Sequence, residues 1–153
     1  MSEVASPALT LTLSRYFDAP PDRVFDAWTG RDWGNWLPPG GATCKVTAID
    51  ARAGGQFEAA MSMPDGRQLT VHGSYRDFQR PERLAFTWEG DFFGSATVVT
   101  VTFRGQGAGT LMTLRQEGFD QDAARAGYES GWSGEGGAFD KLAAFLEREA
   151  AHG

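Results

Sequence analysis

Few side chains in this sequence carry chemistry, and Glu135 is the most conspicuous of them. It interrupts a stripe of otherwise apolar residues whose spacing alternates between four and three, which is the pattern of an amphipathic helix. The stripe consists of Tyr128, Trp132, Glu135, Phe139, Leu142 and Leu146. A carboxylate that faced a cavity from this helix would be a candidate proton acceptor, or an anchor for a ligand amine or hydroxyl. The alternative is a carboxylate that reaches solvent at a bent turn, and the sequence leaves both open.

The remaining polar groups give weaker signals. His72 falls on the strand face opposite its apolar neighbours, which indicates an exposed or structurally satisfied histidine. Tyr75 and Tyr128 could donate hydrogen bonds to a ligand, although a buried tyrosine commonly finds a backbone partner. Cys44 is the only cysteine, so it forms no disulfide within the chain, and it has no acid or base beside it in the sequence.

No cofactor and no metal site are expected. The chain has two histidines, His72 and His152, and no cluster with the spacing of metal ligands. Residues 105–109 (GQGAG) lack the following helix that a dinucleotide-binding fingerprint requires. Residues 131–135 (GWSGE) resemble a nucleophile elbow, but Glu135 replaces the closing glycine and the run has no strand before it. Neither run indicates catalysis.

The composition is typical of one soluble domain. The chain has 153 residues, of which 41% are hydrophobic and 22% charged, and eleven Phe and five Trp predict an unusually aromatic interior. A net charge of −6 and a pI near 4.8 disfavour binding to nucleic-acid phosphates. The start has neither the basic region nor the apolar run of a signal peptide, and no stretch approaches a membrane span. We expect a cytoplasmic protein with no nucleic-acid partner and no membrane span.

The beginning of the chain predicts a strand followed by two short helices. Apolar and polar residues alternate over 9–17, which is typical of a half-buried strand. Pro21 at the first helical position then predicts a helix that ends at Gly30. A second short helix is expected over 31–37, before the helix breaker at 38–41 (PPGG).

The middle of the chain predicts an antiparallel meander. Its segments alternate apolar and polar residues, and turn residues such as the Asp65-Gly66 hairpin signal separate them. Six strands are expected, over residues 43–51, 56–63, 69–78, 83–89, 97–104 and 112–116. The last apolar segment, 123–148, then predicts a long helix, although each of its internal glycines costs roughly 1 kcal/mol relative to alanine.

These elements predict an α+β fold of the helix-grip type. A curved antiparallel sheet of about seven strands would wrap around a long C-terminal helix, with the two short helices after the first strand. We expect a disordered tail at residues 1–8 and a single domain over residues 9–150. The alternative, a closed up-and-down barrel, would not explain a helical pair between the first two strands.

Four motifs in this order resemble the START-related superfamily (SRPBCC, Bet v 1-like). They are residues 14–28 (SRYFDAPPDRVFDAW), 50–57 (DARAGGQF) and 81–88 (PERLAFTW) and the pair Gly131-Trp132. Within the superfamily, the chain is similar to the branch of the Hsp90 ATPase activator C-terminal domain over about residues 9–149. The resemblance implies a cavity between sheet and long helix, and members include lipid carriers, hormone and polyketide binders, and cyclases.

The chain departs from the family pattern in two places. Related sequences often carry a histidine at the end of the last strand, where this chain has Gln116, which puts a role that needs an imidazole there in doubt. Residues 133–137 (SGEGG) separate the Gly-Trp pair from the next large apolar residue, Phe139, and this insertion predicts a bend in the helix.

The glycines of the last helix remove side-chain volume opposite the sheet, so we predict a ligand cavity there. A packed core is the competing interpretation for most of the inward-facing residues. The predicted ligand-binding residues are Trp36, Phe57, Met61, Trp88, Phe92, Phe93, Val101, Met112, Gln116, Trp132, Glu135 and Phe139.

The sequence favours a protein that holds a small apolar ligand, aromatic or lipid-like, and no catalytic residue is assigned. One alternative is an enzyme of the cyclase or hydrolase type that uses Glu135 or His72 as a general base. Another is an interaction protein of the Hsp90 co-chaperone type, which rests on family analogy alone. A homodimer is also left open, through an exposed sheet edge or an exposed Trp33.

Overall fold

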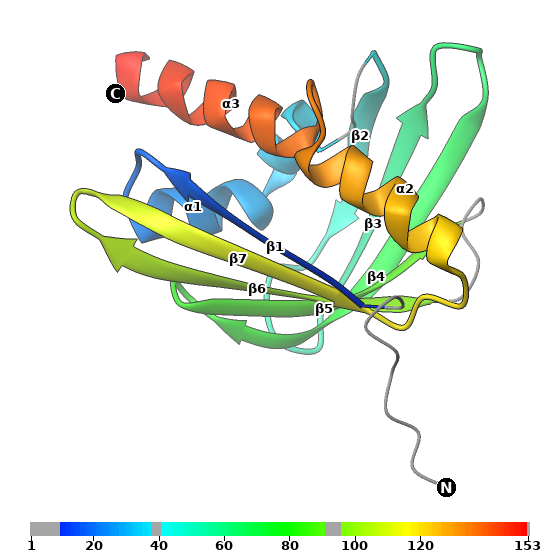
Figure 1. Ribbon diagram of the computed structural model, residues 1–153, viewed down its shortest axis with the longest axis horizontal. Coiled ribbons are helices and arrows are strands. Elements are labelled where there is room, and N and C mark those ends of the chain that lie inside the picture. Colours follow the sequence, from blue (N-terminus) through cyan, green and yellow to red (C-terminus); the bar gives the residue numbers. More distant parts are fainter. Residues whose placement is uncertain (1–9, 38–40, 91–95, 153) are drawn as a thin grey trace, which may run out of the picture.

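The computed structural model describes residues 10–37, 41–90 and 96–152, and its elements follow the predicted order (Figure 1). The predicted tail at 1–8 and the site candidates Phe92 and Phe93 lie outside the described residues. The strands are β1 (Thr10–Phe17), β2 (Thr43–Ile49), β3 (Gln56–Ser62), β4 (Gln68–Gln79), β5 (Arg83–Gly90), β6 (Thr97–Gln106) and β7 (Gly109–Glu117). The helices are α1 (Pro21–Trp28), the 3-10 helix η2 (Arg31–Asn35), α2 (Asp122–Ser133) and α3 (Ala138–His152).

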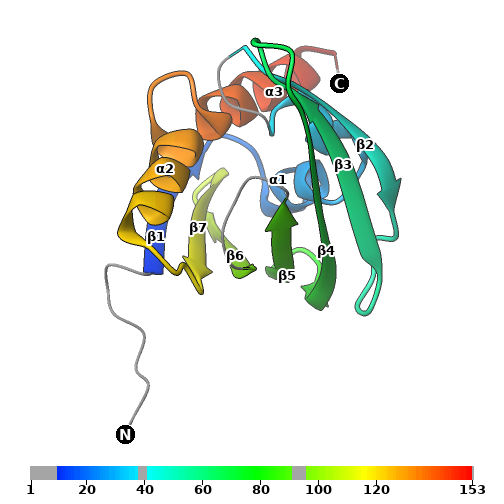
Figure 2. The same ribbon diagram turned by 90° about the vertical axis from the view of Figure 1, so that its right-hand side faces the viewer.

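The seven strands form one antiparallel sheet in the order β1-β7-β6-β5-β4-β3-β2. The sheet curls from β1 at one side to β2 at the other, with the helices on its concave side (Figure 2). Register shifts at Val46/Ala48 in β2 and Tyr75/Asp77 in β4 interrupt the ladder, and such irregularities increase the local twist of a sheet. Because β1 and β2 stand at opposite ends of the strand order, the sheet is open, and the predicted helix-grip fold is confirmed over the closed barrel.

Local sequence explains the β3–β4 hairpin. Gly66 has a φ of 93°, a left-handed conformation that costs glycine little, and its N–H donates to the carbonyl of Met63 at 2.9 Å. The carboxylate of Asp65 accepts a hydrogen bond from the backbone N–H of Arg67 at 2.9 Å. The predicted Asp-Gly turn is therefore present.

The concave face of the sheet is built by strict alternation. In β6 the buried side chains are Thr97, Val99, Val101 and Phe103. In β7 they include Met112, Leu114 and Gln116, as the sequence predicted. These rows pack against α1, η2, α2 and α3 and form one continuous core.

The segment predicted as one long helix consists of α2 and α3, joined at residues 134–137. Gly136 has a φ of 73°, and a Cβ on Gly137 would lie 2.7 Å from the carbonyl oxygen of Gly131. The N–H of Gly136 donates to the carboxylate of Asp140 at 2.9 Å, which ties the turn to the start of α3. The inserted glycines thus break the helix at the place where the sequence predicted a bend.

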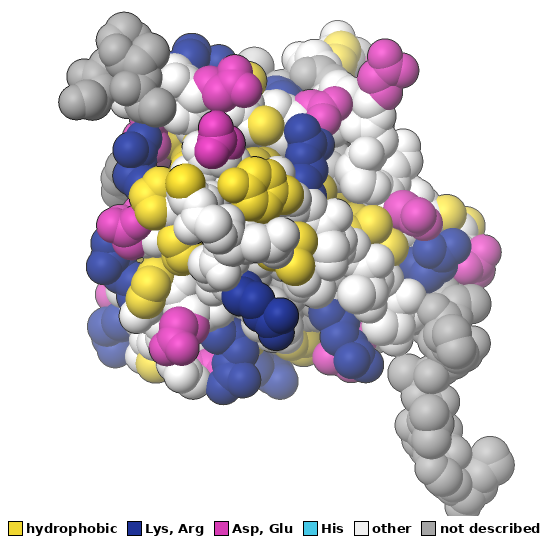
Figure 3. Space-filling model, turned by 60° about the vertical axis from the view of Figure 1, so that its left-hand side comes forward, with side chains coloured by type: hydrophobic (Ala, Val, Ile, Leu, Met, Phe, Trp, Pro, Cys, Tyr) yellow, Lys and Arg dark blue, Asp and Glu magenta, His cyan; other side chains and the backbone are white. Residues whose placement is uncertain are grey.

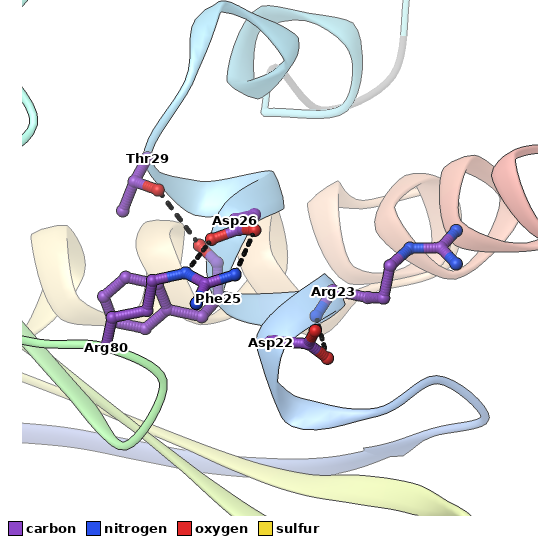
Figure 4. Close-up of polar contacts among 6 residues, drawn as sticks. All are labelled: Asp22, Arg23, Phe25, Asp26, Thr29 and Arg80. Carbon is purple, nitrogen blue, oxygen red and sulfur yellow. Dashed lines mark hydrogen bonds and ion pairs between the residues drawn. The ribbon is translucent and has the colours of Figure 1, made fainter.

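Ion pairs join α1 to its neighbours. The guanidinium of Arg80, in the β4–β5 turn, forms a bidentate ion pair with the carboxylate of Asp26, with N–O distances of 2.7 and 2.8 Å (Figure 4). Arg23 reaches Glu149 on α3 at 3.3 Å. These contacts are at the surface, so they orient α1 more than they stabilise it. Its stability comes from its buried face, Val24, Phe25, Ala27 and Trp28.

The second short helix, η2, corrects one prediction. Trp33 is fully buried, so it offers no exposed surface for a homodimer. Its helix packs tightly against β2, because a Cβ on Gly34 would lie 2.8 Å from the carbonyl oxygen of Cys44. A glycine is needed where η2 comes this close to β2, and the close packing of η2 buries Trp33.

The surface mixes charges of both signs. On the face drawn in Figure 3, acidic and basic side chains surround a group of hydrophobic atoms, and neither sign forms a continuous patch. Tyr16 on β1 is a large hydrophobic side chain that is exposed. None of the helices in the described part of the chain has the length and apolar character needed to cross a bilayer.

Candidate ligand-binding interior

Four buried tryptophans form a closed circuit of neighbouring rings beneath α2. The ring centroids of Trp28 and Trp33 lie 6.3 Å apart, and those of Trp33 and Trp88 lie 5.9 Å apart. The circuit closes through Trp132, which is 6.0 Å from Trp88 and 5.6 Å from Trp28. Because these rings come from α1, η2, β5 and α2, the circuit marks the point where the short helices, the sheet and the last helical segment meet.

A chain of buried hydrogen bonds crosses this circuit. The indole N–H of Trp132 donates to the side-chain oxygen of Gln116 at 3.0 Å. The amide nitrogen of Gln116 donates to the hydroxyl of Thr97 at 2.9 Å, and that hydroxyl lies 3.5 Å from the carbonyl oxygen of Trp88. Gln116 is fully buried, so leaving its amide without partners would be costly. The indole N–H of Trp132, which needs an acceptor, therefore explains why a polar residue occupies this buried position at the end of β7.

Two further indoles are satisfied within the interior. The N–H of Trp88 donates to the hydroxyl of Tyr128 at 2.7 Å, and the N–H of Trp36 donates to the carbonyl of Ala27 at 3.0 Å. Tyr128 and Trp132 are the two buried side chains of α2. The same two residues thus provide both the apolar contact and the hydrogen bonds that hold α2 over the sheet.

Three buried polar atoms stand out, because they have no hydrogen-bond partner in the described structure. They are the indole nitrogens of Trp28 and Trp33 and the hydroxyl oxygen of Tyr75. All three side chains are at most 2% exposed. Buried polar groups in native proteins nearly always have a partner, and an exception is a candidate position for water or a ligand.

The two buried tyrosines stay protonated. Burial raises the pKa of the Tyr75 hydroxyl, and the charge of Asp50 adds to that increase. Burial also raises the pKa of Tyr128, while the hydrogen bond from Trp88 acts in the opposite direction. Both hydroxyls therefore remain neutral at physiological pH, and neither supplies a negative charge to the interior.

The acid and the base that the sequence offered for catalysis lie elsewhere. Glu135 is exposed in the turn between α2 and α3, so the solvent-reaching alternative is the one that the structure adopts. His72 is exposed on the outer face of β4, as its alternation predicted, and is paired in register with Glu58 on β3 and Glu89 on β5. These three residues line an outer hollow of about 560 Å³ together with Ala48, Gln56, Phe57, Gly73 and Ser74.

Most of the predicted site residues share the interior. Nine of them are buried: Trp36, Phe57, Met61, Trp88, Val101, Met112, Gln116, Trp132 and Phe139. Their burial agrees with both a cavity lining and a packed core, so their role in ligand binding stays a prediction. Sequence reasoning missed Trp28, Trp33 and Thr97. The helical spacing of Val24, Phe25 and Trp28 was a signal that could have identified Trp28, whereas a five-residue 3-10 helix gives no periodic pattern that could identify Trp33.

Within residues 10–37, 41–90 and 96–152, no three His, Cys, Asp or Glu side chains are placed so that they could hold a metal ion. The buried interior consists of aromatic and aliphatic side chains with a few neutral hydrogen-bonding groups.

Known proteins show the same fold. The family model described as activator of Hsp90 ATPase homolog 1-like protein matches residues 18–147. No curated protein matches the chain. A solved structure from Chromobacterium violaceum is 29% identical, with a TM-score of 0.83, and the match covers 91% of this chain and 97% of that one. The AHSA1 protein from Silicibacter pomeroyi is 24% identical, with a TM-score of 0.78 and coverage of 92% and 99%. A protein from Rhodobacter sphaeroides is 22% identical, with a TM-score of 0.80 and coverage of 94% and 95%.

Proposed function

The chain belongs to the activator of Hsp90 ATPase homolog 1-like family, and on that premise we propose that it binds a small, largely aromatic molecule in the interior between the sheet and α2. The observation that carries the proposal is the set of buried polar atoms without partners in the described structure, those of Trp28, Trp33 and Tyr75. A protein that kept these groups for packing alone would lose stability for each one. A ligand that accepted hydrogen bonds from these groups would restore the lost stability.

The attachment of α2 offers a way into this interior. Over its 12 residues, α2 buries Tyr128 and Trp132, and the turn at residues 134–137 separates it from α3. Segments with few buried apolar contacts open at a low free-energy cost. In our proposal the ligand enters when α2 lifts from the sheet at this turn, and the hydrogen bonds to Gln116 and Trp88 close the site again.

Catalysis is not part of this proposal. The buried polar side chains in the described structure, apart from the aromatic ones, are Thr97, Thr110 and Gln116, none of which is an acid or a base. Glu135 and His72, the candidates for a cyclase or hydrolase, are exposed. A general base must reach the proton that it removes, and from these positions it would have to act on a substrate outside the interior.

A fluorescent apolar probe tests the proposal. N-Phenyl-1-naphthylamine is uncharged and absorbs where tryptophan emits, so a probe held near the four indoles should quench their emission by energy transfer. We expect saturable binding at one site per chain and a rise in melting temperature that grows with probe concentration. Tyr16→Phe, on the exposed face of β1, serves as the matched control and should bind as the wild-type chain does.

Two results would contradict the proposal. One is the absence of saturable binding to this probe and to two uncharged tricyclic compounds, 9-fluorenone and fluorene. The other is a crystal structure of the complex in which the probe occupies the outer hollow beside His72 while the interior remains filled by side chains. Substitution of Glu58 or Glu89, which line that hollow, by Gln should leave interior binding unchanged and provides the corresponding solution test.

The family description favours one further candidate, activation of the Hsp90 ATPase. It would be tested by the rate of ATP hydrolysis of purified Hsp90 with and without the chain. An increase that saturates with the concentration of the chain would support it, and an unchanged rate at a several-fold molar excess would end it. The two candidates are separable, because the first needs no second protein.

A further inference from the structure

The partnerless polar groups of the interior share one chemical property. An indole N–H can donate a hydrogen bond and cannot accept one, so Trp28 and Trp33 each present a donor. Tyr75 is protonated, and its hydroxyl can also donate. The interior therefore offers three buried donors that no described residue accepts.

These donors are connected by neighbouring rings. Trp28 and Trp33 lie 6.3 Å apart between ring centroids, and Trp33 is 5.0 Å from Phe57. Phe57 is in turn 5.6 Å from Tyr75. The three donor-bearing side chains thus belong to one group of neighbouring rings, which runs from α1 through η2 to the strands β3 and β4.

Two of the interior acceptors, by contrast, already have a donor. The side-chain oxygen of Gln116 accepts from Trp132, and the hydroxyl of Tyr128 accepts from Trp88. A ligand that brought hydrogen-bond donors would have to share these two oxygens with the indoles that already donate to them. A ligand that brought acceptors would meet groups without a partner.

The interior also lacks charge. In the described structure no Asp, Glu, Lys or Arg side chain is among the buried residues. A charged ligand group would lose its hydration there without gaining an opposite charge, and that cost is large in a medium of low polarity.

From these observations we infer that the ligand is an uncharged aromatic molecule that presents hydrogen-bond acceptors, such as carbonyl or ether oxygens, to Trp28, Trp33 and Tyr75. This inference rests on the proposed function, and it specifies in addition which polar groups the ligand carries. A site built to hydrogen-bond a polar group discriminates strongly against the analogue that lacks the group, because its own buried group then stays unpaired.

A matched pair of tricyclic probes tests the polarity. 9-Fluorenone and fluorene have nearly the same shape, but only the ketone carries an acceptor oxygen. Each affinity is referred to the compound's partition from water into cyclohexane, so that differences in hydration are removed. We expect the ketone to bind about tenfold more tightly than the hydrocarbon on this scale. Protonated 9-aminofluorene and the anion of fluorene-9-carboxylic acid, which carry opposite charges, should bind more weakly than both.

Trp33→Phe removes the N–H and keeps an aromatic ring. It should reduce the advantage of 9-fluorenone over fluorene, although Trp28 and Tyr75 still offer donors, whereas Tyr16→Phe should leave the advantage unchanged. The fold of each variant is checked by its melting curve. A second measurement needs no variant: the carbonyl stretching band of bound 9-fluorenone should lie at lower wavenumber than the band of the same ketone in cyclohexane, since hydrogen bonding to an N–H weakens the C=O bond.

The outcomes separate the inference from the proposed function. If both tricyclic compounds bind with equal corrected affinity and the carbonyl band matches that in cyclohexane, the interior binds ligands but the inferred polarity is wrong. If the charged compounds bind best, the inference is wrong as well. If no compound binds, the proposed function fails and the inference fails with it.

Discussion

The indole N–H of Trp132 on α2 lies 3.0 Å from the side-chain oxygen of Gln116 on β7 and donates a hydrogen bond to it. Both side chains are buried, and the amide of Gln116 is also bound to Thr97 of the neighbouring strand β6. One amide therefore joins two strands to the helix that covers them. Polar groups that are satisfied in this way specify a single arrangement of the elements that carry them.

Replacement of Gln116 by Leu should destabilise the fold. The substitution preserves approximate volume but leaves the indole N–H of Trp132 and the hydroxyl of Thr97 without their amide partner. Because unpaired buried groups carry a desolvation cost, we expect the free energy of unfolding to fall by about 1–3 kcal/mol, measured by urea denaturation. Gln106→Leu at the exposed end of β6 is the control and should change it by less than about 0.5 kcal/mol. Equal effects of the two substitutions would contradict the role assigned to Gln116.

Hydrogen exchange should distinguish α2 from α3. The buried side chains of α2 are Tyr128 and Trp132, whereas α3 buries a longer apolar row: Ala138, Phe139, Leu142, Phe145 and Leu146. Segments that bury little apolar surface open more readily, so amides in the middle of α2 should exchange at least about tenfold faster than those of α3. Mass spectrometry of the exchanged protein measures this. Equal protection would show that α2 and α3 open as one unit, and would remove the entry route in the proposed function.

The sequence predicted those parts of the molecule that depend on local periodicity. Val99, Val101 and Phe103 recur every second residue, so the strand and its buried face could be assigned without any knowledge of its neighbours. The same alternation put Gln116 on the inner face. The helix break followed from the glycines of residues 134–137, whose backbone requirements are also local.

The hydrogen-bonding pattern of the interior could not be predicted in this way. Which indole reaches Gln116 depends on how α2 crosses the sheet, and that crossing is set by packing among residues far apart in the sequence. Trp33 shows the limit most clearly, since it lies in a segment too short for periodicity and was offered as an exposed residue, yet it is fully buried. Glu135 is the opposite case, since it was offered as a cavity residue and is exposed. Its position in an apolar stripe did not indicate which residues would face solvent once the helix was broken.

Two glycine-to-alanine substitutions should change stability in opposite directions. A methyl group on Gly73 in β4 would overlap the carbonyl oxygen of Thr87 and lie 2.8 Å from the ring of Phe57. Since both neighbours are held in the sheet and its core, we expect Gly73→Ala to lower the free energy of unfolding by at least about 2 kcal/mol.

Gly127→Ala is the matched substitution on α2. A Cβ at this exposed position has no neighbouring atom within 4 Å, so the gain in helix propensity should raise the free energy of unfolding by about 0.5–1 kcal/mol. Both values are measured by urea denaturation of the same preparation. A neutral Gly73→Ala would show that β4 and β5 can separate at this point without cost.

The reactivity of Cys44 should depend on pH in a way that reports its burial. Desolvation raises the pKa of this thiol to about 11, and the positive charge of Lys141 only partly offsets the increase. The thiolate is the reactive form, and an unperturbed cysteine has a pKa near 8.5, so at pH 8 the folded chain should hold roughly two hundredfold less thiolate than the unfolded chain. Alkylation by iodoacetamide, followed by mass spectrometry of the intact chain, should accordingly be much slower in the folded chain, and its rate should keep increasing as the pH rises through 10.

The same reaction in 6 M guanidinium chloride is the control, and its rate should level off above about pH 9 because the thiol is then largely ionised. A folded-state rate that levelled off at the same pH as the control would mean that the thiol of Cys44 is not desolvated in the folded chain.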